Sequence, residues 1–411
     1  TSFTGSAGSL TIGGSDQASS LEAATINLQG AAPEKAGTAT FPVTVTLAKS
    51  GALGGATSDI TVATGAKIVM GESTDGASIA GKSLTLNGGV LTVDGAKNFK
   101  ISSTTVDVKS GSDFSIGTGT VTFDKATNIT FAANTLTNSG TIALGTLNDT
   151  RSVNLTVGAD AFNTQLFKGA AKVTFAGTDN KPATLTIKAT GSDVLELVDS
   201  GLFAAATGTI DNTNALHATQ SGAQVNFAIE GEKAKLASDL FDAGNSFKSV
   251  KAKFGTLTVG KNDSSKAFTV KAGEITVGSA LTHAKADQGI LISGGTLNLD
   301  GASGSVTAKS LAVGDASAKG TLNIKNGAWS IPSLTMVSGA ATVDKATVTL
   351  QKDAVLTTKN NDNKLTLTSS TLDVTAGKVQ LTESGAALNT GSKLSIAKEQ
   401  LFTATGDTAT L

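Results

Sequence analysis

Histidine and cysteine, the side chains that most often act as nucleophiles, proton carriers and metal ligands, are scarce in this chain. Its 411 residues include 2 histidines, His217 and His283, and 0 cysteines. Neither histidine has a second histidine at metal-ligand spacing or an acidic partner in a recognisable motif. We therefore predict that both are ordinary surface or turn residues. The lack of cysteine excludes disulfides, thiolate metal sites and cysteine nucleophiles.

Carboxylates are the remaining candidates for catalysis. Asp94, Asp107, Asp113 and Asp124 lie in successive segments of one region. β-Helical glycosidases and lyases gather two or three carboxylates in a groove on one face, so an alignment of these four would indicate such an enzyme. Their spacing is irregular, however, and Asp113 and Asp124 adjoin turns, where carboxylates commonly cap backbone amides. We favour this structural role and predict no catalytic residue.

Other ligand-binding patterns are weak or absent. The chain has no nucleophile elbow, P-loop or zinc-protease motif, and we expect no cofactor. The polar runs at residues 211–214 and 360–363 could supply oxygens to a weak calcium site, although solvated turns are the favoured reading. A sugar-binding site would offer aromatic platforms, yet the chain has 1 tryptophan and 0 tyrosines. We expect that tryptophan, Trp329, to be packed or at an edge.

Short strands dominate the elements that would position any site. Between residues 83 and 144 and again beyond residue 255, apolar residues alternate with Thr, Ser or Lys over three or four positions, and Asn-Gly, Asp-Gly or Gly-Ser interrupts each run. Two segments have nearly the same sequence, GGTLNLDG at 294–301 and KGTLNIKNG at 319–327. Loose repetition at this scale predicts stacked coils that bury their apolar faces against their neighbours.

We predict an all-β fold, a right-handed parallel β-helix or solenoid with a few short helices; tandem β-sandwich domains are the alternative. Asn-Gly and Asp-Gly dipeptides suit either hairpins or solenoid corners. We prefer corners, because an antiparallel arrangement of this length would create many edges, and the chain has few of the Pro and charged blocks that protect edges.

The pattern changes along the chain and suggests four sections. Residues 1–50, with Pro33 and Pro42, are expected to form an N-terminal capping section. Residues 51–157 and 255–411 are expected to be β-solenoid, the latter with a C-terminal cap. Residues 158–254 are expected to be β-rich with short helical insertions, because residues 159–167, 198–203 and 235–241 have helical spacing and a Leu-Phe or Phe ending, as does 398–402.

Charge and composition narrow the class of partner. The chain has 32 basic and 33 acidic residues, a formal charge of -1, and no basic run. Nucleic acid is therefore not expected as a partner. No apolar stretch is long enough for a transmembrane segment. The first residues, Thr-Ser-Phe-Thr-Gly, do not form a signal peptide, so we expect this start to result from processing or from the choice of fragment.

The strand phrases at residues 320–324 and 333–343, GTLNI and SLTMVSGAATV, resemble the passenger regions of bacterial autotransporter adhesins and related surface proteins. The resemblance covers roughly residues 60–157 and 255–396. It rests on the repeated pattern of short strands and turns rather than on a diagnostic motif. It implies a right-handed β-helix displayed at the cell surface that works by adhesion, self-association or matrix building. A passenger fragment and a surface-layer or filament subunit both fit this likeness.

The sequence thus favours a non-enzymatic structural or adhesive protein, secreted or at a bacterial cell surface. We expect self-association into an oligomer, sheet or filament, with host or cell-surface glycans as further partners. A phage tailspike-like or polysaccharide-degrading β-helical enzyme is the alternative.

Overall fold

The fold is described here from a computed structural model. It describes residues 1–14, 18–31, 41–70, 76–93, 98–132, 135–144, 152–158, 172–175, 183–190, 194–197, 216–218, 225–236, 247–260, 262, 265–271, 273–352, 354–357, 364–376, 379–382, 385–396 and 402–405. Between residues 158 and 250 it describes only the backbone.

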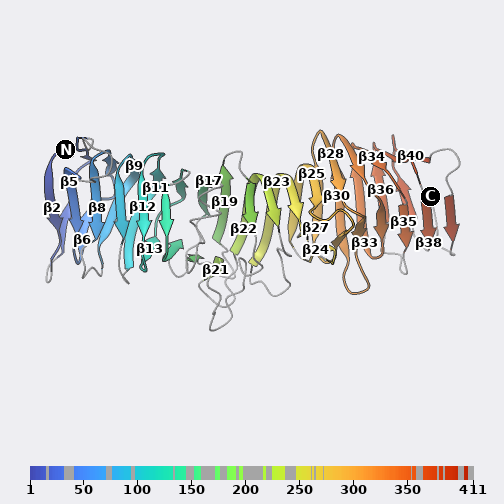
Figure 1. The fold of residues 1–411 in the computed structure, drawn as a ribbon, viewed down its shortest axis with the longest axis horizontal. Coiled ribbons are helices and arrows are strands. Elements are labelled where there is room, and N and C mark those ends of the chain that lie inside the picture. Colours follow the sequence, from blue (N-terminus) through green and yellow to red (C-terminus); the bar gives the residue numbers. More distant parts are fainter. Residues whose placement is uncertain are drawn as a thin grey trace. The chain divides into compact units, whose positions relative to one another are not determined.

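The described chain is an all-β parallel solenoid, as predicted. Among the described residues every pairing between named strands is parallel, and the one antiparallel contact there is an isolated bridge between Ala63 and Gly88. A β-sandwich would require antiparallel neighbours, so the alternative of tandem sandwiches is wrong. Within each of the two units described below, the strands follow one another in chain order (Figure 1).

The chain divides into two compact units. Unit 1 comprises Thr1–Leu195, Gly201–Ala228 and Ser246–Lys248, and unit 2 comprises Glu196–Ser200, Ile229–Asn245 and Ser249–Leu411. The division passes through β20 (Val194–Leu197), β22 (Val225–Leu236) and β23 (Phe247–Val259). The four sections predicted from the sequence stay a prediction.

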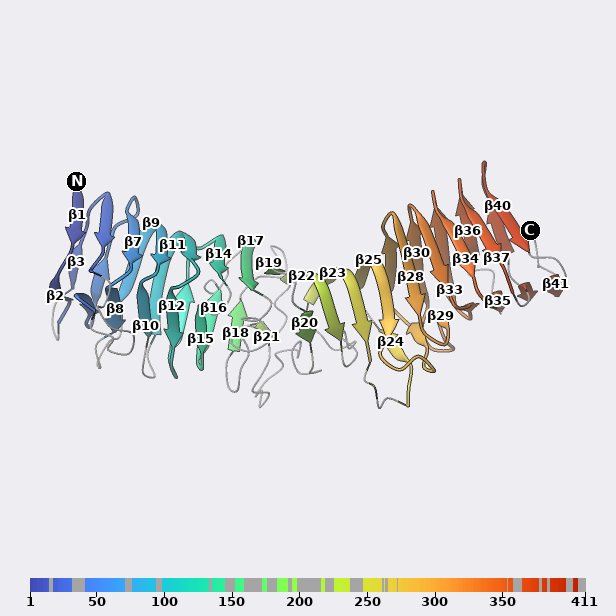
Figure 2. The same cartoon turned by 45° about the horizontal axis from the view of Figure 1, so that its top comes forward.

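In unit 1 the described strands form three parallel stacks, which we name faces A, B and C (Figure 2). Face A contains β1 (Ser2–Gly5), β4 (Thr25–Leu28), β7 (Asp59–Ala63), the second halves of β9 (Ser78–Asn87) and β11 (Asn98–Val108), β14 (Asn128–Phe131), β17 (Ser152–Gly158) and β19 (Ala183–Thr190). Face B contains β2 (Gly8–Ile12), β5 (Val43–Leu47), β8 (Ala66–Met70), β10 (Val90–Val93), β12 (Asp113–Ile116) and β15 (Leu136–Asn138). Face C contains β3 (Ser19–Leu21), β6 (Gly51–Leu53), the first halves of β9 and β11, β13 (Thr120–Phe123), β16 (Thr141–Leu144), β18 (Lys172–Phe175) and β21 (Leu216–Ala218).

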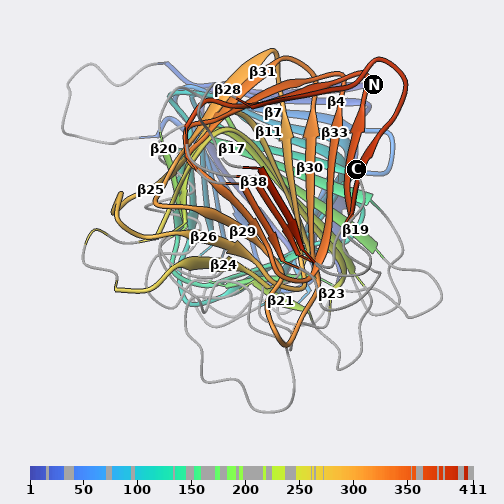
Figure 3. The same ribbon diagram turned by 90° about the vertical axis from the view of Figure 1, so that its right-hand side faces the viewer.

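Unit 2 repeats this plan in faces D, E and F (Figure 3). Face D contains the first parts of β23 and β25 (Glu274–His283), β27 (Thr296–Asp300), β30 (Gly320–Lys325), β33 (Gly339–Asp344), β36 (Lys364–Thr368) and β39 (Gly385–Leu388). Face E contains the second parts of β23 and β25, β28 (Ser303–Thr307), β31 (Ala328–Ile331), β34 (Thr347–Leu350), β37 (Thr371–Val374) and β40 (Lys393–Ile396). Face F contains β24 (Phe268–Val270), β26 (Ile290–Ile292), β29 (Leu311–Val313), β32 (Leu334–Met336), β35 (Ala354–Thr357), β38 (Val379–Thr382) and β41 (Phe402–Thr405).

Alternate side chains of each strand point into the core, as the sequence pattern requires. In β13, Val121 and Phe123 are buried, whereas Thr120 and Thr122 are partly exposed. An aromatic cluster fills part of unit 1, since the ring centroid of Phe114 lies 5.4 Å from that of Phe131. Each fully buried side chain of this size contributes about 1.5 to 3 kcal/mol, so stacking holds the coils together.

Corner residues turn the chain between faces. Asn326 and Gly327 separate β30 from β31, and both have positive φ, 60° in each case. A Cβ at Gly327 would lie 2.1 Å from the carbonyl oxygen of Ala302, so only glycine fits there. This Asn-Gly pair therefore acts as a corner, which is the role preferred from the sequence.

The short helices predicted from the sequence are not present among the described residues. The described residues contain no helix. Lys235 and Leu236 end strand β22, and Phe402 begins strand β41, so these residues of two predicted helical turns are extended. The remaining residues of those turns, and residues 159–167 and 198–203, lie outside the described part of the chain.

Trp329, for which we predict a packed or edge position, is packed: it is 1% exposed and is the largest buried side chain described. It lies in register with Gly304 of the preceding coil, and a Cβ on Gly304 would lie 2.3 Å from Cζ3 of the indole. The missing side chain of Gly304 thus leaves the space that the indole occupies.

We expect Gly304→Ala to lower the free energy of unfolding of unit 2 by about 1 to 3 kcal/mol, the usual cost of overpacking a core. Gly278→Ala is the matched control, because a Cβ there would have no neighbour closer than 3.5 Å. Urea unfolding followed by tryptophan fluorescence measures both variants. Equal stability of the two would contradict the pairing of Gly304 with Trp329.

Candidate functional site

Of the four carboxylates selected from the sequence, the three that the structure describes do not converge. Asp107 lies on face A, Asp113 begins β12 on face B, and Asp124 follows β13 on face C. Asp124 forms an ion pair with Lys100, with 3.3 Å between Nζ and Oδ2. Asp94 lies outside the described residues. These three aspartates therefore face in different directions and form no catalytic pair.

The two histidines differ in what the structure shows. The backbone of His217 belongs to β21, and its side chain is outside the description. His283, at the end of β25, is 1% exposed. The prediction that it is a surface or turn residue is wrong, because it occupies an inward position of its strand. The alternation of β25 (EITVGSALTH) signals this, since His283 lies two residues after the inward Leu281.

Metal ligands are not gathered in the part of the chain that the structure describes. No group of three or more His, Asp or Glu side chains there could hold a metal ion. The two polar runs considered for calcium, 211–214 and 360–363, lie outside that part. Among the described residues there is also no helix long and apolar enough to cross a bilayer.

Face A of unit 1 is a regular polar surface. Two outward positions of each strand align from coil to coil in two rows, while the residues between them are buried. One row contains Thr25, Asp59, Ser83, Thr105, Asn128 and Asn154, and the other contains Asn27, Thr61, Thr85, Asp107, Thr130 and Thr156.

Hydrogen bonds link neighbours within these rows. The Ser83 hydroxyl donates to Oδ1 of Asp59 at 2.6 Å, and Nδ2 of Asn154 donates to Oδ1 of Asn128 at 3.1 Å. Asp59 and Asp107 are the charged members of the rows from β4 to β17, and Lys188 of β19 follows Thr156 in register. Face A therefore presents hydroxyl and amide groups at the strand spacing of about 4.8 Å, with few charges.

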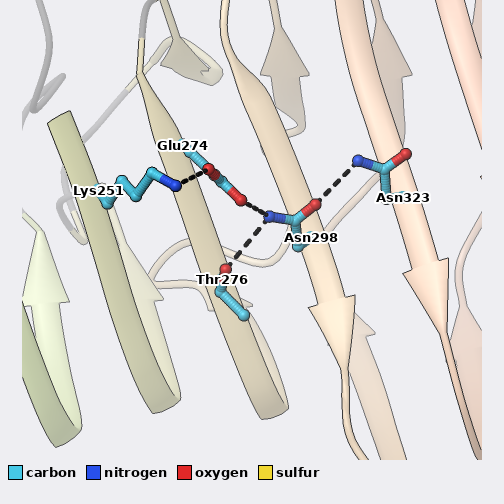
Figure 4. A network of polar contacts seen from close by, with 5 residues as sticks. All are labelled: Lys251, Glu274, Thr276, Asn298 and Asn323. Atoms are coloured by element: carbon cyan, nitrogen blue, oxygen red, sulfur yellow. Dashed lines mark hydrogen bonds and ion pairs between the residues drawn. The ribbon is translucent and has the colours of Figure 1, made fainter. Parts of the chain in front are cut away.

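Face D of unit 2 has a deeper polar arrangement, which crosses four strands (Figure 4). Nδ2 of Asn298 on β27 donates to Oε1 of Glu274 at 2.6 Å and to Oγ1 of Thr276 at 3.2 Å. Oδ1 of Asn298 accepts a hydrogen bond from Nδ2 of Asn323 at 2.9 Å, and Lys251 lies 3.4 Å from Glu274. Asn298 is 6% exposed although it points away from the core.

These contacts fix the register of face D. Both amide hydrogens and the carbonyl oxygen of Asn298 are used, so a shift of one residue between coils would leave buried polar groups without partners. We name Lys251, Glu274, Thr276, Asn298 and Asn323 the face D ladder. Its exposed ion pair adds little, because surface salt bridges contribute about 0 to 1 kcal/mol.

A shallow groove of about 420 Å³ lies on face E. Its hydroxyl-bearing lining residues are Ser279, Ser303, Ser305, Ser330 and Thr349, and Gly304, Ala328 and Trp329 complete the lining. None of these side chains is acidic or basic. The groove can donate and accept hydrogen bonds, but its lining has no base that would activate a serine.

A further polar cluster connects two coils at a corner. Asp315 accepts hydrogen bonds from the hydroxyl of Ser293 at 2.6 Å, from the hydroxyl and amide of Ser317 at 2.6 and 2.8 Å, and from the amide of Ala318 at 2.9 Å. The Ser293 and Ser317 hydroxyls, and then the Ser317 amide, hold the pKa of Asp315 well below its usual range.

Comparison with known protein families gives a match for one region of the chain. Residues 49–156 match the family model of the G8 domain. The match lies within unit 1 and covers β6 to β16 and most of β17, including most of face A. No curated protein and no solved structure matches the chain. The chain is thus a β-solenoid protein with a G8-like region, and its likeness to autotransporter passengers stays a prediction.

We expect Asn298→Ala to lower the free energy of unfolding by about 1 to 3 kcal/mol, because it leaves Glu274 and Asn323 without their shared partner in a buried place. Asn154→Ala removes a similar amide bond at an exposed place and should cost less than about 1 kcal/mol. Denaturant titration of both variants tests this difference, and equal losses would show that the face D ladder does not fix its coils.

Asp315→Ala should cost about 1 kcal/mol at pH 7, as for loss of a carboxylate cap. The depressed pKa of Asp315 means that its stabilisation is complete above the unfolded value of about 3.9 and is lost as the pH falls through the lower folded value. The gap between wild type and variant should therefore narrow below about pH 4 in urea titrations. Asp373→Ala, an outward carboxylate on β37, serves as the control, and a gap independent of pH would contradict the assignment.

Proposed function

We propose that this chain is a non-enzymatic structural or adhesive protein, secreted or at a bacterial cell surface, which works through contacts of its polar faces with further copies of itself. The observation that carries the proposal is the pair of aligned rows on face A. The bacterial surface setting is supported by composition, which combines abundant Thr, Ser, Gly, Ala and Asn with 0 Cys, 0 Tyr and 1 Trp.

Periodicity makes a second copy a suitable partner. Hydroxyl and amide groups on face A recur at about 4.8 Å, and another copy offers the same repeat. Two such faces can therefore place many donors opposite many acceptors at once. Each contact is weak, but contacts on linked sites reinforce one another because later ones form within a single complex.

Charge also favours contact between like faces. From β4 to β17 the two rows of face A contain the acidic residues Asp59 and Asp107, and one basic residue, Lys188 of β19, follows Thr156 in register. A low charge density limits both the repulsion between copies and the cost of removing water from the surface.

The proposal is tested by placing lysines in one row of face A. Thr85→Lys with Thr130→Lys would put like charges opposite each other when two copies meet, and we expect at least about tenfold weaker association by sedimentation velocity. Thr92→Lys with Ser115→Lys makes the same change on outward positions of face B and should leave association near the wild-type level.

Electron microscopy of the wild type should show oligomers, sheets or filaments. A wild-type protein that stays monomeric at high concentration would contradict self-association. Binding of the monomer to a glycan array with loss in the face A variant would instead assign the face to carbohydrate. Hydrolysis of a polysaccharide by the wild type would overturn the non-enzymatic assignment.

A further inference from the structure

His283 lies in a niche that is made for a neutral imidazole. It stacks in register on Val259 of the preceding coil. The backbone N–H of Lys285 donates to Nδ1 of His283 at 3.1 Å. This bond requires an unprotonated Nδ1, so the single proton of the neutral ring is on Nε2.

The other ring nitrogen has no partner. Nε2 of His283 is buried without a hydrogen-bond acceptor. Gly260, with a φ of 74°, packs against this edge of the ring, and a Cβ there would lie 2.6 Å from Nε2. The niche thus offers one donor and no acceptor to a group that, once protonated, would need two acceptors.

The charged groups around His283 do not replace the missing acceptors. The turn Ala284–Gly289 contributes Lys285 and Asp287, whose charged atoms lie 3.8 Å apart, and Lys309 follows β28 on the next coil. On the preceding coil, Val259 and Gly260 are uncharged. Burial lowers the pKa of His283 and outweighs two opposing effects, the backbone hydrogen bond with Lys285 and then the carboxylate of Asp287, both of which raise this pKa.

Four backbone hydrogen bonds hold the turn that His283 anchors. The amide of Ala284 donates to the carbonyl of Val259 at 2.8 Å, the amide of Gln288 to that of Lys285 at 3.0 Å, the amide of Phe268 to that of Gly289 at 3.1 Å, and the amide of Lys309 to that of Gln288 at 2.9 Å. The strands before and after the turn, β25 and β26, pair with strands of the neighbouring coils and bury their inward side chains. Opening of the turn therefore disrupts much less structure than separation of the coils.

We propose that His283 is an acid-sensitive latch, which holds the corner between β25 and β26 closed when neutral and releases it when protonated. Proton uptake would set an Nδ1–H against the N–H of Lys285 and leave a cation in the niche. Rotation of the ring into water removes both the repulsion between the two N–H groups and the cost of a buried cation. It also frees residues 284–289, while strands β25 and β26 stay hydrogen-bonded to the neighbouring coils. This device is independent of the proposed association through face A.

The direction of the pH effect follows from linkage. His283 has a lower pKa in the closed corner than in water, so the open form binds the proton first. The closed corner is favoured fully above about pH 6.5 and loses stability as the pH falls below this value, until the folded pKa is reached. Further acidification adds nothing from this residue.

Hydrogen exchange with mass spectrometry tests the latch in the full chain at pH 7.5 and 5.5, after correction for intrinsic exchange rates. We expect amides of residues 283–290 to exchange several-fold faster at pH 5.5, and at most about tenfold, because one group titrating one unit below its free pKa shifts an equilibrium by no more than that factor. Amides of β30 and β31 should keep their protection.

Two variants keep the test decisive. His283→Gln and His283→Val, the latter copying Val259 of the preceding coil, should each remove the pH dependence of residues 283–290. His217→Gln is the matched control, since the chain has 2 histidines, and it should behave as wild type. Unchanged exchange between the two pH values in wild type, or persistence of the effect in both His283 variants, would overturn the proposal.

Discussion

In-register stacking of coils is the constraint on which the described structure depends. Each parallel ladder places a residue directly over the residue at the same position of the preceding coil, so both the core and the surface consist of columns. Ile60, Leu84, Val106, Ile129 and Leu155 form one inward column of unit 1, and all are buried. An apolar side chain in such a column is covered by its neighbours above and below, whereas a single coil would leave it open to water.

Columns also explain how the chain accommodates unusual residues. A large side chain needs a small one in the adjacent coil, as Trp329 needs Gly304. A polar side chain that is covered by its neighbours needs partners along the column, as Asn298 has in Glu274 and Asn323. The same rule makes His283 exceptional, because its column provides Val259 rather than a hydrogen-bond acceptor. Nearest neighbours in the stack therefore decide whether a residue stabilises the fold.

The sequence predicts the strands and their parallel stacking well, because alternation and corner dipeptides are local signals. GTLNLD and GTLNIK align in register on β27 and β30, as their likeness suggests. Placement around the coil is harder to predict, since it depends on the length of every corner. Asp107, Asp113 and Asp124 are close in sequence and still lie on three faces. The burial of His283 follows from its position two residues after the inward Leu281, whereas the residue type alone predicts a surface histidine.

Local coupling has a consequence for function. Because a coil contacts its neighbours and little else, a change at one corner affects the adjacent coils and leaves distant rows in place. The surface rows of face A belong to unit 1, whereas His283 and the face D ladder belong to unit 2. Association through a repeated face becomes stronger as more coils take part, whereas the proposed sensitivity to acid requires only one coil. A solenoid can therefore hold many equivalent contact positions and still devote a single coil to a different task, provided that the columns on either side of that coil remain filled.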